Sequence, residues 1–265
     1  MTGLLQTTLE VDKQFALFAR EVRRMVAFEG MAYRHDAEAI ELRDGHRATH
    51  SATYDLVLGD ASLGTVAAYR DVPFTDADVR TLENLLCALV YPLRNALAYR
   101  RAVQRALRDP LTGVANRAAF EQALARELEL ARRQHIPLSL LIVDIDHFKA
   151  CNDCHGHSFG DDVLRAVANT VTTTVRRSDL VFRYGGEEFV VLASHTAAPG
   201  ARLLAERIRE NVARLRTIGG RELSLSVSVG VTAFQEDDDA RHLFDRADAA
   251  LYRAKAEGRD RVCDS

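Results

Sequence analysis

The chain has 265 residues, 47% of them hydrophobic and 28% charged, which is typical of a soluble globular protein with one large or two ordinary domains. Its net charge of -3 provides no overall attraction to nucleic acid or to an anionic membrane, and no apolar run reaches the ~18 residues of a membrane span. Because the N-terminus lacks a signal-peptide pattern, we expect the four cysteines to be reduced thiols and the protein to be cytoplasmic.

The first part of the chain predicts a small α+β domain. Apolar residues recur at helical spacing from Leu4 to about Phe28, and Gly30 ends that pattern. Short strand-like segments follow, and two longer ones flank the turn Gly59-Asp60 as a hairpin. This arrangement resembles a shortened GAF-type sensor fold, which we assign to residues 1–98 as a sensor or dimerisation domain. Three histidines, His35, His46 and His50, are metal or haem ligands in one interpretation and exposed loop residues in the favoured one.

A long helix is predicted to follow this domain. Thr75 is a suitable N-cap with acidic residues directly after it, and leucines recur at roughly heptad spacing toward Leu107, with a kink expected at Pro92. Residues 99–108 then form a helical linker. The helix either packs on its own sheet or pairs with its copy in a second subunit.

The remaining residues, 109–265, form a second predicted domain. Proline and glycine in Asp109-Pro110-Leu111-Thr112-Gly113 stop the long helix. Alternating helical and strand patterns follow, in the order β-α-β-β-α-β with an extra leading helix. They indicate an α+β fold with a central antiparallel sheet, a ferredoxin-like core and helices on one face. The expected elements are helices over 116–133, 162–175, 201–215 and 242–256, and strands over 138–146, 179–182, 190–192 and 222–231.

One stretch of this domain carries unusual chemistry. Two β-branched runs flank Arg183-Tyr184-Gly185-Gly186-Glu187-Glu188-Phe189, which predicts a hairpin whose glycines supply positive φ and allow a ligand to approach the backbone closely. Asp144 ends a buried strand that should lie beside this hairpin. Asp144 and Glu187 would then converge on a divalent cation such as Mg²⁺, which prefers hard carboxylate oxygens. Solvated turn carboxylates are the alternative.

Several motifs in this domain resemble those of one family. Gly185-Gly186-Glu187-Glu188-Phe189 resembles the signature of GGDEF-domain diguanylate cyclases in its Glu-containing variant. The resemblance extends over residues 109–265. Its other motifs are Asp109-Pro110-Leu111-Thr112-Gly113 with Asn116-Arg117, and Asp144-Ile145-Asp146-His147-Phe148-Lys149 with Asn152-Asp153, Gly156-His157 and Gly160-Asp161.

This resemblance implies a palm fold like that of nucleotide cyclases and polymerases, and the condensation of two GTP molecules into cyclic di-GMP. It implies that Asp144, Glu187 and the Ile145 carbonyl hold Mg²⁺, or Mn²⁺ in its place, and that Glu188 assists at the metal or accepts the 3′-hydroxyl proton. It also implies a homodimer, because each bound GTP attacks the other. Residues implied in GTP binding and charge neutralisation are Phe148, Lys149, Asn152, Asp161, Gly185, Gly186, Lys255 and Arg259.

A second motif lies upstream of the glycines. Arg176 and Asp179 form an R-x-x-D pattern, with five residues between Asp179 and Gly185. The resemblance implies that this pattern binds cyclic di-GMP as a feedback inhibitor, with Arg207 as a further contact. Taken alone, the same pair is an ordinary surface ion pair.

Alternatives to an active enzyme remain at this stage. A non-catalytic cyclic di-GMP or GTP receptor, or a GTP-binding dimerisation module, would keep the fold without turnover. Cys151, Cys154, His155 and His157 have a spacing that suggests zinc, but they overlap the nucleotide segment and have no second ligand pair nearby.

Overall fold

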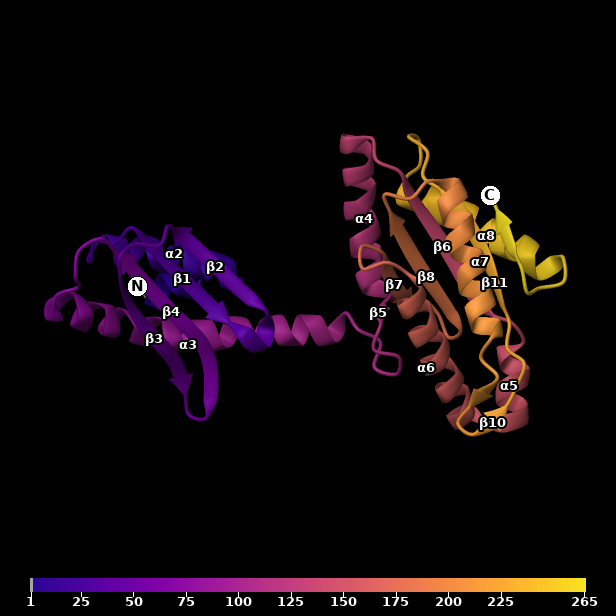
Figure 1. The fold of residues 1–265 in the computed structure, drawn as a ribbon, viewed down its shortest axis with the longest axis horizontal. Helices are drawn as coiled ribbons and strands as arrows, with labels where there is room; N and C mark the ends of the chain where they lie inside the picture. Colours follow the sequence, from indigo (N-terminus) through magenta and orange to yellow (C-terminus); the bar gives the residue numbers. More distant parts are fainter. Residues whose placement is uncertain (1) are drawn as a thin grey trace. The chain divides into compact units, whose positions relative to one another are not determined.

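The computed structural model describes residues 2–265, which divide into two compact units, one ending at Arg105 and one running from Ala106 to Ser265. Each unit has its own sheet and its own hydrophobic core (Figure 1). Among the helices of residues 2–265, none combines the length and the apolar character that a bilayer crossing requires.

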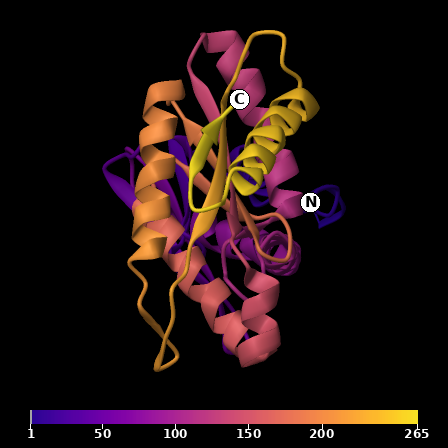
Figure 2. The same ribbon diagram turned by 90° about the vertical axis from the view of Figure 1, so that its right-hand side faces the viewer.

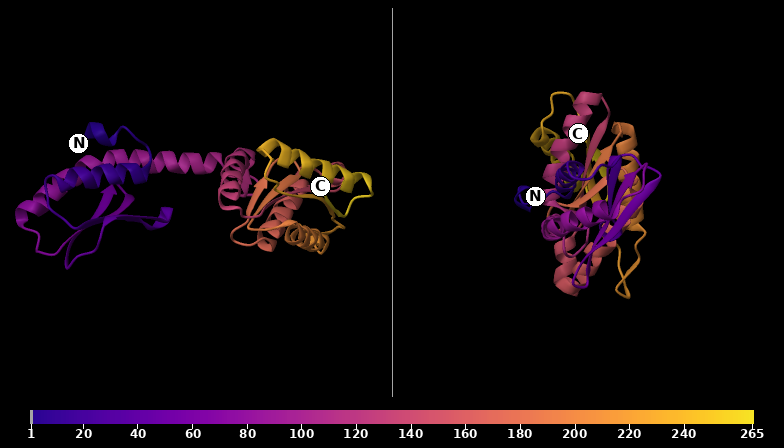
Figure 3. Two further views of the ribbon diagram at one scale, coloured as in Figure 1. Left: turned by 90° about the horizontal axis from the view of Figure 1, so that it is seen from above. Right: turned by 90° about the vertical axis from the view of Figure 1, so that its left-hand side faces the viewer.

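The N-terminal unit is a four-stranded antiparallel sheet, in the order β2-β1-β4-β3, with helices on one face (Figure 3). Leucines of α3 and phenylalanines of α2 cover that face and bury Met31 and Tyr33 of β1. The elements are α1 (Thr2–Leu5), α2 (Val11–Arg23), β1 (Gly30–His35), the 3-10 helix η1 (Asp36–Glu38), β2 (Ile40–Gly45), β3 (His50–Leu58), β4 (Ala61–Arg70) and α3 (Asp76–Ala106).

The single helix predicted over residues 4–28 is wrong, because the structure has two helices with a break between them. Gln14 explains the break. Its side chain is 1% exposed, and its amide nitrogen donates to the carbonyls of Leu5 at 3.0 Å and Thr8 at 2.9 Å, which therefore need no helical partner. The predicted long helix is confirmed as α3, which continues through Pro92; the kink expected there stays a prediction.

The C-terminal unit contains a six-stranded sheet in the order β12-β11-β6-β8-β7-β5. Its four central strands are antiparallel neighbours and, with α6 and α7, give the predicted β-α-β-β-α-β order. The elements are β5 (Ala115–Asn116), α4 (Arg117–Gln134), β6 (Leu138–Ile145), α5 (Phe148–His155), α6 (His157–Thr174), β7 (Leu180–Arg183), β8 (Glu188–Ser194), α7 (Ala198–Ala213), β9 (Thr217–Ile218), β10 (Arg221–Glu222), β11 (Val227–Ala233), α8 (Ala240–Ala256) and β12 (Val262–Asp264).

Helices cover both faces of this sheet, so the prediction of helices on one face was wrong for the unit as a whole. The two crossover helices α6 and α7 pack on one face, and α4 and α8 pack on the other (Figure 2). This arrangement buries all eight residues of β6. The carboxylates at the end of β6 therefore lie next to an interior from which water is excluded. This burial influences their pKa values, as described below.

The strand predicted over residues 222–231 is also divided. Gly219 (φ 55°) and Gly220 (φ 78°) form the turn of the small β9–β10 hairpin, and β11 begins only at Val227. Between them lies Ser226, whose hydroxyl donates to the Asp146 carboxylate and whose carbonyl accepts from the Asp146 amide, just beyond the end of β6. The irregular segment thus forms part of the surroundings of the strand end.

Candidate functional site

The glycine turn between β7 and β8 is fixed from outside by one arginine. Arg183 donates from Nη1 to both oxygens of Asp109, at 3.0 and 3.2 Å, and from Nη2 to the carbonyl of Gly186 at 2.7 Å. Hydrogen bonding and the Arg183 guanidinium lower the pKa of Asp109 against the opposing effect of burial, which is the largest single influence. The opening motif at Asp109 is therefore attached directly to the turn.

The tyrosine before the glycines anchors the turn on its other side. Tyr184 packs against Phe244 of α8 with tilted rings at 4.7 Å between centroids and meets Phe120 of α4 edge-on at 5.5 Å. Arg117 lies over the Tyr184 ring at 4.6 Å. The aromatic cluster ties the turn to the helices of one face of the sheet.

The positive φ predicted for the two glycines was wrong. Neither Gly185 nor Gly186 has φ in the left-handed region. Gly185 instead packs against Glu188, since a Cβ there would lie 2.5 Å from Oε2 at the mobile end of that side chain. A Cβ at Gly186 would meet nothing within 4 Å. A side chain at the first glycine would thus displace the Glu188 carboxylate, whereas one at the second would meet no atom of the chain.

Three carboxylates lie near one another where β6 ends and β8 begins. Asp144 pairs directly with Glu188 across the ladder, and the amide of Ile145 donates to the carbonyl of Glu187 at 3.3 Å. Burial raises the pKa of Asp144, which is 4% exposed. Burial, and then the Asp144 charge, also raise the pKa values of Glu187 and Glu188. The prediction that Asp144 lies beside the hairpin is confirmed.

Lys255 of α8 partly balances this negative charge. Its Nζ lies 2.7 Å from Oδ2 of Asp144, and its charge lowers the pKa values of all three carboxylates. Within residues 2–265, no three His, Cys, Asp or Glu side chains are grouped closely enough to hold an ion as they stand. The donor chemistry nevertheless fits a hard divalent cation, because the oxygens are anionic, desolvated and mutually repulsive.

Sequence reasoning missed the role of the neighbouring Asp146. This carboxylate is 6% exposed and accepts hydrogen bonds from the hydroxyls of Ser226 and Ser228, both at 2.7 Å. It also accepts from the amide of Asp260 at 3.1 Å. Asp146 therefore connects β6 and β11 to the segment after α8. The small-polar face of the predicted strand over 222–231 was the available signal.

Arg259 lies beyond the helix that carries Lys255. Helix α8 ends at Ala256, and Gly258 follows with φ 115°. The amide of Arg259 donates back to the carbonyl of Ala254 at 3.0 Å, which closes the helix end. Arg259 and Asp260 both adopt left-handed φ, at 64° and 46°. Arg259 lies close enough to Asp144 for its charge to lower the pKa of that group.

The segment after β6 provides groups suited to a nucleotide. Helix α5 begins at the buried Phe148, and the exposed Lys149 lies in its first turn, where helical amides lack internal partners. Asn152 is wedged against Gly160, where a Cβ would lie 1.8 Å from Oδ1 of Asn152. That buried Oδ1 has no hydrogen-bond partner among the described residues. Asp161 lies half-buried on α6, one residue beyond Gly160.

The R-x-x-D residues line a separate cavity of about 440 Å³ together with Arg207 of α7. Asp179 is 8% exposed and accepts a hydrogen bond from the backbone amide of Arg176 at 2.9 Å. Arg207 donates to the carbonyl of Thr174 at 2.9 Å. Within residues 2–265, the side chains of Arg176 and Asp179 do not form the simple ion pair that was considered as an alternative. Two arginines and a buried carboxylate thus face one cavity.

The histidines of the N-terminal unit are not uniformly exposed loop residues. His46 is exposed in the loop after β2, but His50 is half-buried at the start of β3. His35, at the end of β1, is 4% exposed. The expectation was therefore wrong for His35 and His50. The four cysteines are free thiols in the structure.

Comparisons with known proteins decide the family. The sequence model described as "Diguanylate cyclase, GGDEF domain" matches residues 106–261. The diguanylate cyclase DgcS of Shewanella oneidensis is 31% identical over 257 residues, which are 97% of this chain and 84% of that protein. The chain belongs to the GGDEF diguanylate cyclase family.

Other members of the GGDEF family agree with this assignment. The diguanylate cyclase DgcP of Pseudomonas aeruginosa is 45% identical over 160 residues, which are 60% of this chain and 24% of DgcP. The chain spans about a quarter to a third of the length of the curated relatives that match it first. The coiled coil and GGDEF domain of DgcB from Caulobacter crescentus, solved with c-di-GMP, matches with a TM-score of 0.62 and 33% identity, over 72% of this chain and 100% of that one.

Proposed function

We propose that the chain is an active diguanylate cyclase, which condenses two GTP molecules into cyclic di-GMP with release of two pyrophosphates. The observation that carries the proposal is the proximity of Asp144, Glu187 and Glu188 where β6 ends, beside Lys255, in a chain of the GGDEF family. A receptor without catalysis would have no need for three desolvated carboxylates at this place.

Asp144 and Glu187, with the Ile145 carbonyl and Glu188, would hold Mg²⁺, or Mn²⁺ in its place. When bound, such a cation neutralises charge on the phosphates and lowers the pKa of the attacking hydroxyl. The raised pKa values of the three carboxylates support this assignment, because a cation would relieve their mutual repulsion. Glu187 or Glu188 would accept the proton of the 3′-hydroxyl, and the elevated pKa suits either one to that role.

GTP would bind between the turn and α5. The unpartnered Oδ1 of Asn152 and the carboxylate of Asp161 would hydrogen-bond guanine. The open space at Gly186 and the clearance at Gly185 would admit the nucleotide beside the backbone. The free amides of Phe148 and Lys149 at the start of α5, with the Lys149, Lys255 and Arg259 side chains, would neutralise the phosphates.

The reaction requires two sites that face each other, so we propose a homodimer. Exposed apolar side chains on α3 support pairing through that helix. Tyr91 is 57% exposed, Tyr99 is 50% exposed and Val103 is 37% exposed, and the four-residue interval between Tyr99 and Val103 places those two on one helix face. We propose the rest of the N-terminal unit as a GAF-like sensor domain.

The cavity at Arg176, Asp179 and Arg207 would bind cyclic di-GMP as a feedback inhibitor. Two guanidinium groups suit its phosphates, and the buried carboxylate suits the N–H edge of guanine. DgcB of Caulobacter crescentus was solved with c-di-GMP. The Arg176→Ala variant should lose product inhibition, whereas Arg177→Ala, at the exposed neighbour outside the cavity lining, should keep it. Unchanged inhibition in Arg176→Ala would remove this assignment.

The decisive experiment incubates the full chain with GTP and Mg²⁺ and measures cyclic di-GMP and pyrophosphate by chromatography. We expect both products in a one-to-two ratio, and none from Glu187→Ala. Glu236→Gln, which removes a carboxylate whose side chain is 86% exposed, is the matched control and should retain activity. A dimeric protein that binds GTP but forms no product would overturn the enzyme in favour of a receptor or a dimerisation module.

A further inference from the structure

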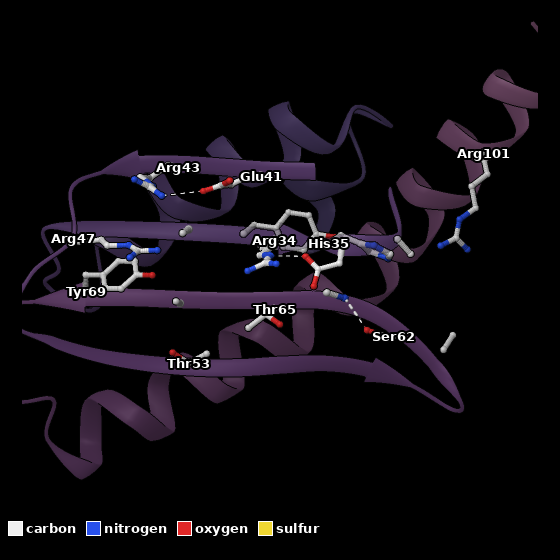
Figure 4. A pocket seen from close by; sticks show the side chains of 17 residues that line it. Arg34, His35, Glu41, Arg43, Arg47, Thr53, Ser62, Thr65, Tyr69 and Arg101 are labelled. Atoms are coloured by element: carbon white, nitrogen blue, oxygen red, sulfur yellow. Dashed lines mark hydrogen bonds and ion pairs between the residues drawn. The ribbon is translucent and has the colours of Figure 1, made fainter. Parts of the chain in front are cut away.

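The uncovered face of the N-terminal sheet contains a cavity of about 720 Å³, which we call the arginine hollow (Figure 4). Its floor follows one row of cross-strand neighbours. Ala32 of β1 pairs with Ala67 of β4, and Ala67 pairs with Thr53 of β3. The adjacent rows carry the larger side chains of Arg34 and Tyr69. Small residues between large ones make a depression on a sheet that would otherwise be flat.

The walls of the hollow are rich in arginine. Arg34 pairs with Asp36, Arg43 pairs with Glu41 at 3.0 Å, and Arg101 pairs with Glu38. Arg47 has no carboxylate partner within residues 2–265 and lies over the Tyr69 ring at 5.9 Å from its centroid. A guanidinium that rests on an aromatic face keeps the donors at its edge free. The hollow therefore carries an uncompensated positive charge with unused donors.

A buried histidine borders one end of the hollow. His35 lines the hollow and is 4% exposed, and its Nδ1 accepts a hydrogen bond from the amide of Glu38 at 3.3 Å. The neutral ring must then carry its proton on Nε2. That Nε2 is buried and has no hydrogen-bond partner among the described residues. His35 alternates along β1 with Met31 and Tyr33, so its ring lies on the helix-covered side of the strand and closes the end of the hollow without donating into it.

We propose that the arginine hollow binds a small organic anion, whose carboxylate or phosphate group pairs with Arg47 and whose apolar body lies on Ala32 and Ala67. The volume is within the ordinary range of small-molecule sites, about 300–1,000 Å³. The alanine floor suits a ring or a short hydrocarbon better than it suits a bare inorganic ion. This site is independent of the proposed cyclase chemistry, and its test does not use activity.

The test is isothermal titration of the full chain with benzoate, cinnamate and phenyl phosphate as probes. Acetate and inorganic phosphate are the controls without an apolar body, and benzyl alcohol is the control without charge. We expect one saturable site per chain for at least one of the three aromatic anions, and at least tenfold weaker binding of the controls. Benzoate and phenyl phosphate distinguish a preference for carboxylate from one for phosphate.

Two variants locate the site. Arg47→Gln should weaken the bound probe about tenfold by removing the free guanidinium, and Ala67→Leu should abolish binding by filling the floor. Arg94→Gln is the matched control, since Arg94 also lies over a tyrosine, Tyr91 at 5.3 Å, but outside the hollow. Saturable binding by none of the aromatic anions, or equal binding by Arg47→Gln and Arg94→Gln, would overturn the proposal.

Discussion

Asp144 and Asp146 stand two residues apart at the end of β6, 4% and 6% exposed, and yet their surroundings differ in kind. Three neutral donors fixed by the fold surround Asp146, from Ser226, Ser228 and the amide of Asp260. Asp144 forms an ion pair with Lys255 and has two further carboxylates beside it. The hydrogen bonds of Asp146 are therefore satisfied within the chain. Around Asp144, negative charge remains that a ligand or an ion could neutralise.

This difference separates a positioning residue from a proposed catalytic one. Asp146 connects β11 and the left-handed segment at Arg259–Asp260 to β6, and thereby holds Arg259 near the cluster. Two consecutive non-glycine residues at positive φ are strained by about 1–3 kcal/mol each, so they need such a connection. Asp144 contributes little to the stability of the fold, because the cost of burying its charge opposes the favourable ion pair with Lys255.

The sharpest test of the comparison is Asp144→Asn. It keeps the shape of the side chain and an oxygen for Lys255, but removes the charge that the proposed cation needs. We expect cyclase activity to fall by about 10²–10³-fold, while the free energy of unfolding changes by less than about 1 kcal/mol. Initial rates of cyclic di-GMP formation and urea unfolding followed by circular dichroism measure the two quantities. Loss of stability equal to that of an Asp146 variant would abolish the distinction between the two aspartates.

Asp146→Asn should show the opposite balance. The asparagine side chain has one acceptor oxygen, whereas three groups donate to Asp146 in the unaltered protein. The backbone N–H of Asp260 can only donate, so a buried donor is left unsatisfied. We expect about 2–3 kcal/mol lower stability and faster hydrogen exchange at Asp260. Activity should fall only about tenfold, through displacement of Arg259.

Asp162→Asn is the control for Asp146→Asn, because Asp162 forms an ion pair with Arg165 in which both side chains are about half exposed. It should change stability by only a few tenths of a kcal/mol. Exchange at Asp260 that remained as slow as in the unaltered protein would show that Asp146 does not hold the segment.

The two glycines of the turn extend the comparison to a smaller effect. Gly185→Ala places a Cβ 2.5 Å from Oε2 of Glu188, so that carboxylate must move and activity should fall about tenfold. Gly186→Ala meets no atom within 4 Å and should leave stability unchanged. Its expected effect is on the KM for GTP, because the nucleotide is proposed to lie beside this open position. An unchanged KM in Gly186→Ala would contradict the proposed approach of GTP.

Sequence patterns predicted the connectivity of the C-terminal unit and the proximity of Asp144 to the hairpin, because hydrophobic periodicity and motif order report on both. They did not predict that α4 and α8 cover the second face, although the continuous apolar run of β6 was consistent with burial on both sides. The residue pattern of a strand shows which side chains point to each face of the sheet, but it does not show which helix covers that face.

Local chemistry was harder to predict where one long-range contact decides it. Gln14 breaks the first helix by binding Leu5 and Thr8, and Gly258 ends α8 before Arg259. The fixed donors of Asp146 come from residues 80 or more positions away. Periodicity carries no information about such contacts, so the role of Asp146 and the place of Arg259 appeared only in the structure.

The smallest expected effect concerns pH. Raised pKa values of Asp144, Glu187 and Glu188 mean that the metal-free folded protein binds more protons than the unfolded chain, from the ordinary carboxyl values of 3.8 and 4.5 up through the raised values. Its free energy of unfolding should therefore fall as pH rises through that window. With excess Mg²⁺, bound ion replaces those protons, so the fall should become smaller or reverse.

Thermal midpoints measured from pH 4 to pH 8, with Mg²⁺ and with a chelator, test this prediction. Glu188→Gln should make the chelated profile flatter, because it removes one of the three raised groups and lessens the repulsion on another. Glu236→Gln, at an exposed carboxylate, should leave the profile as it was. Identical profiles with Mg²⁺ and with the chelator would show that the cluster at the end of β6 binds no ion in the free protein. The contrast between Asp144 and Asp146 would then rest on Lys255 alone.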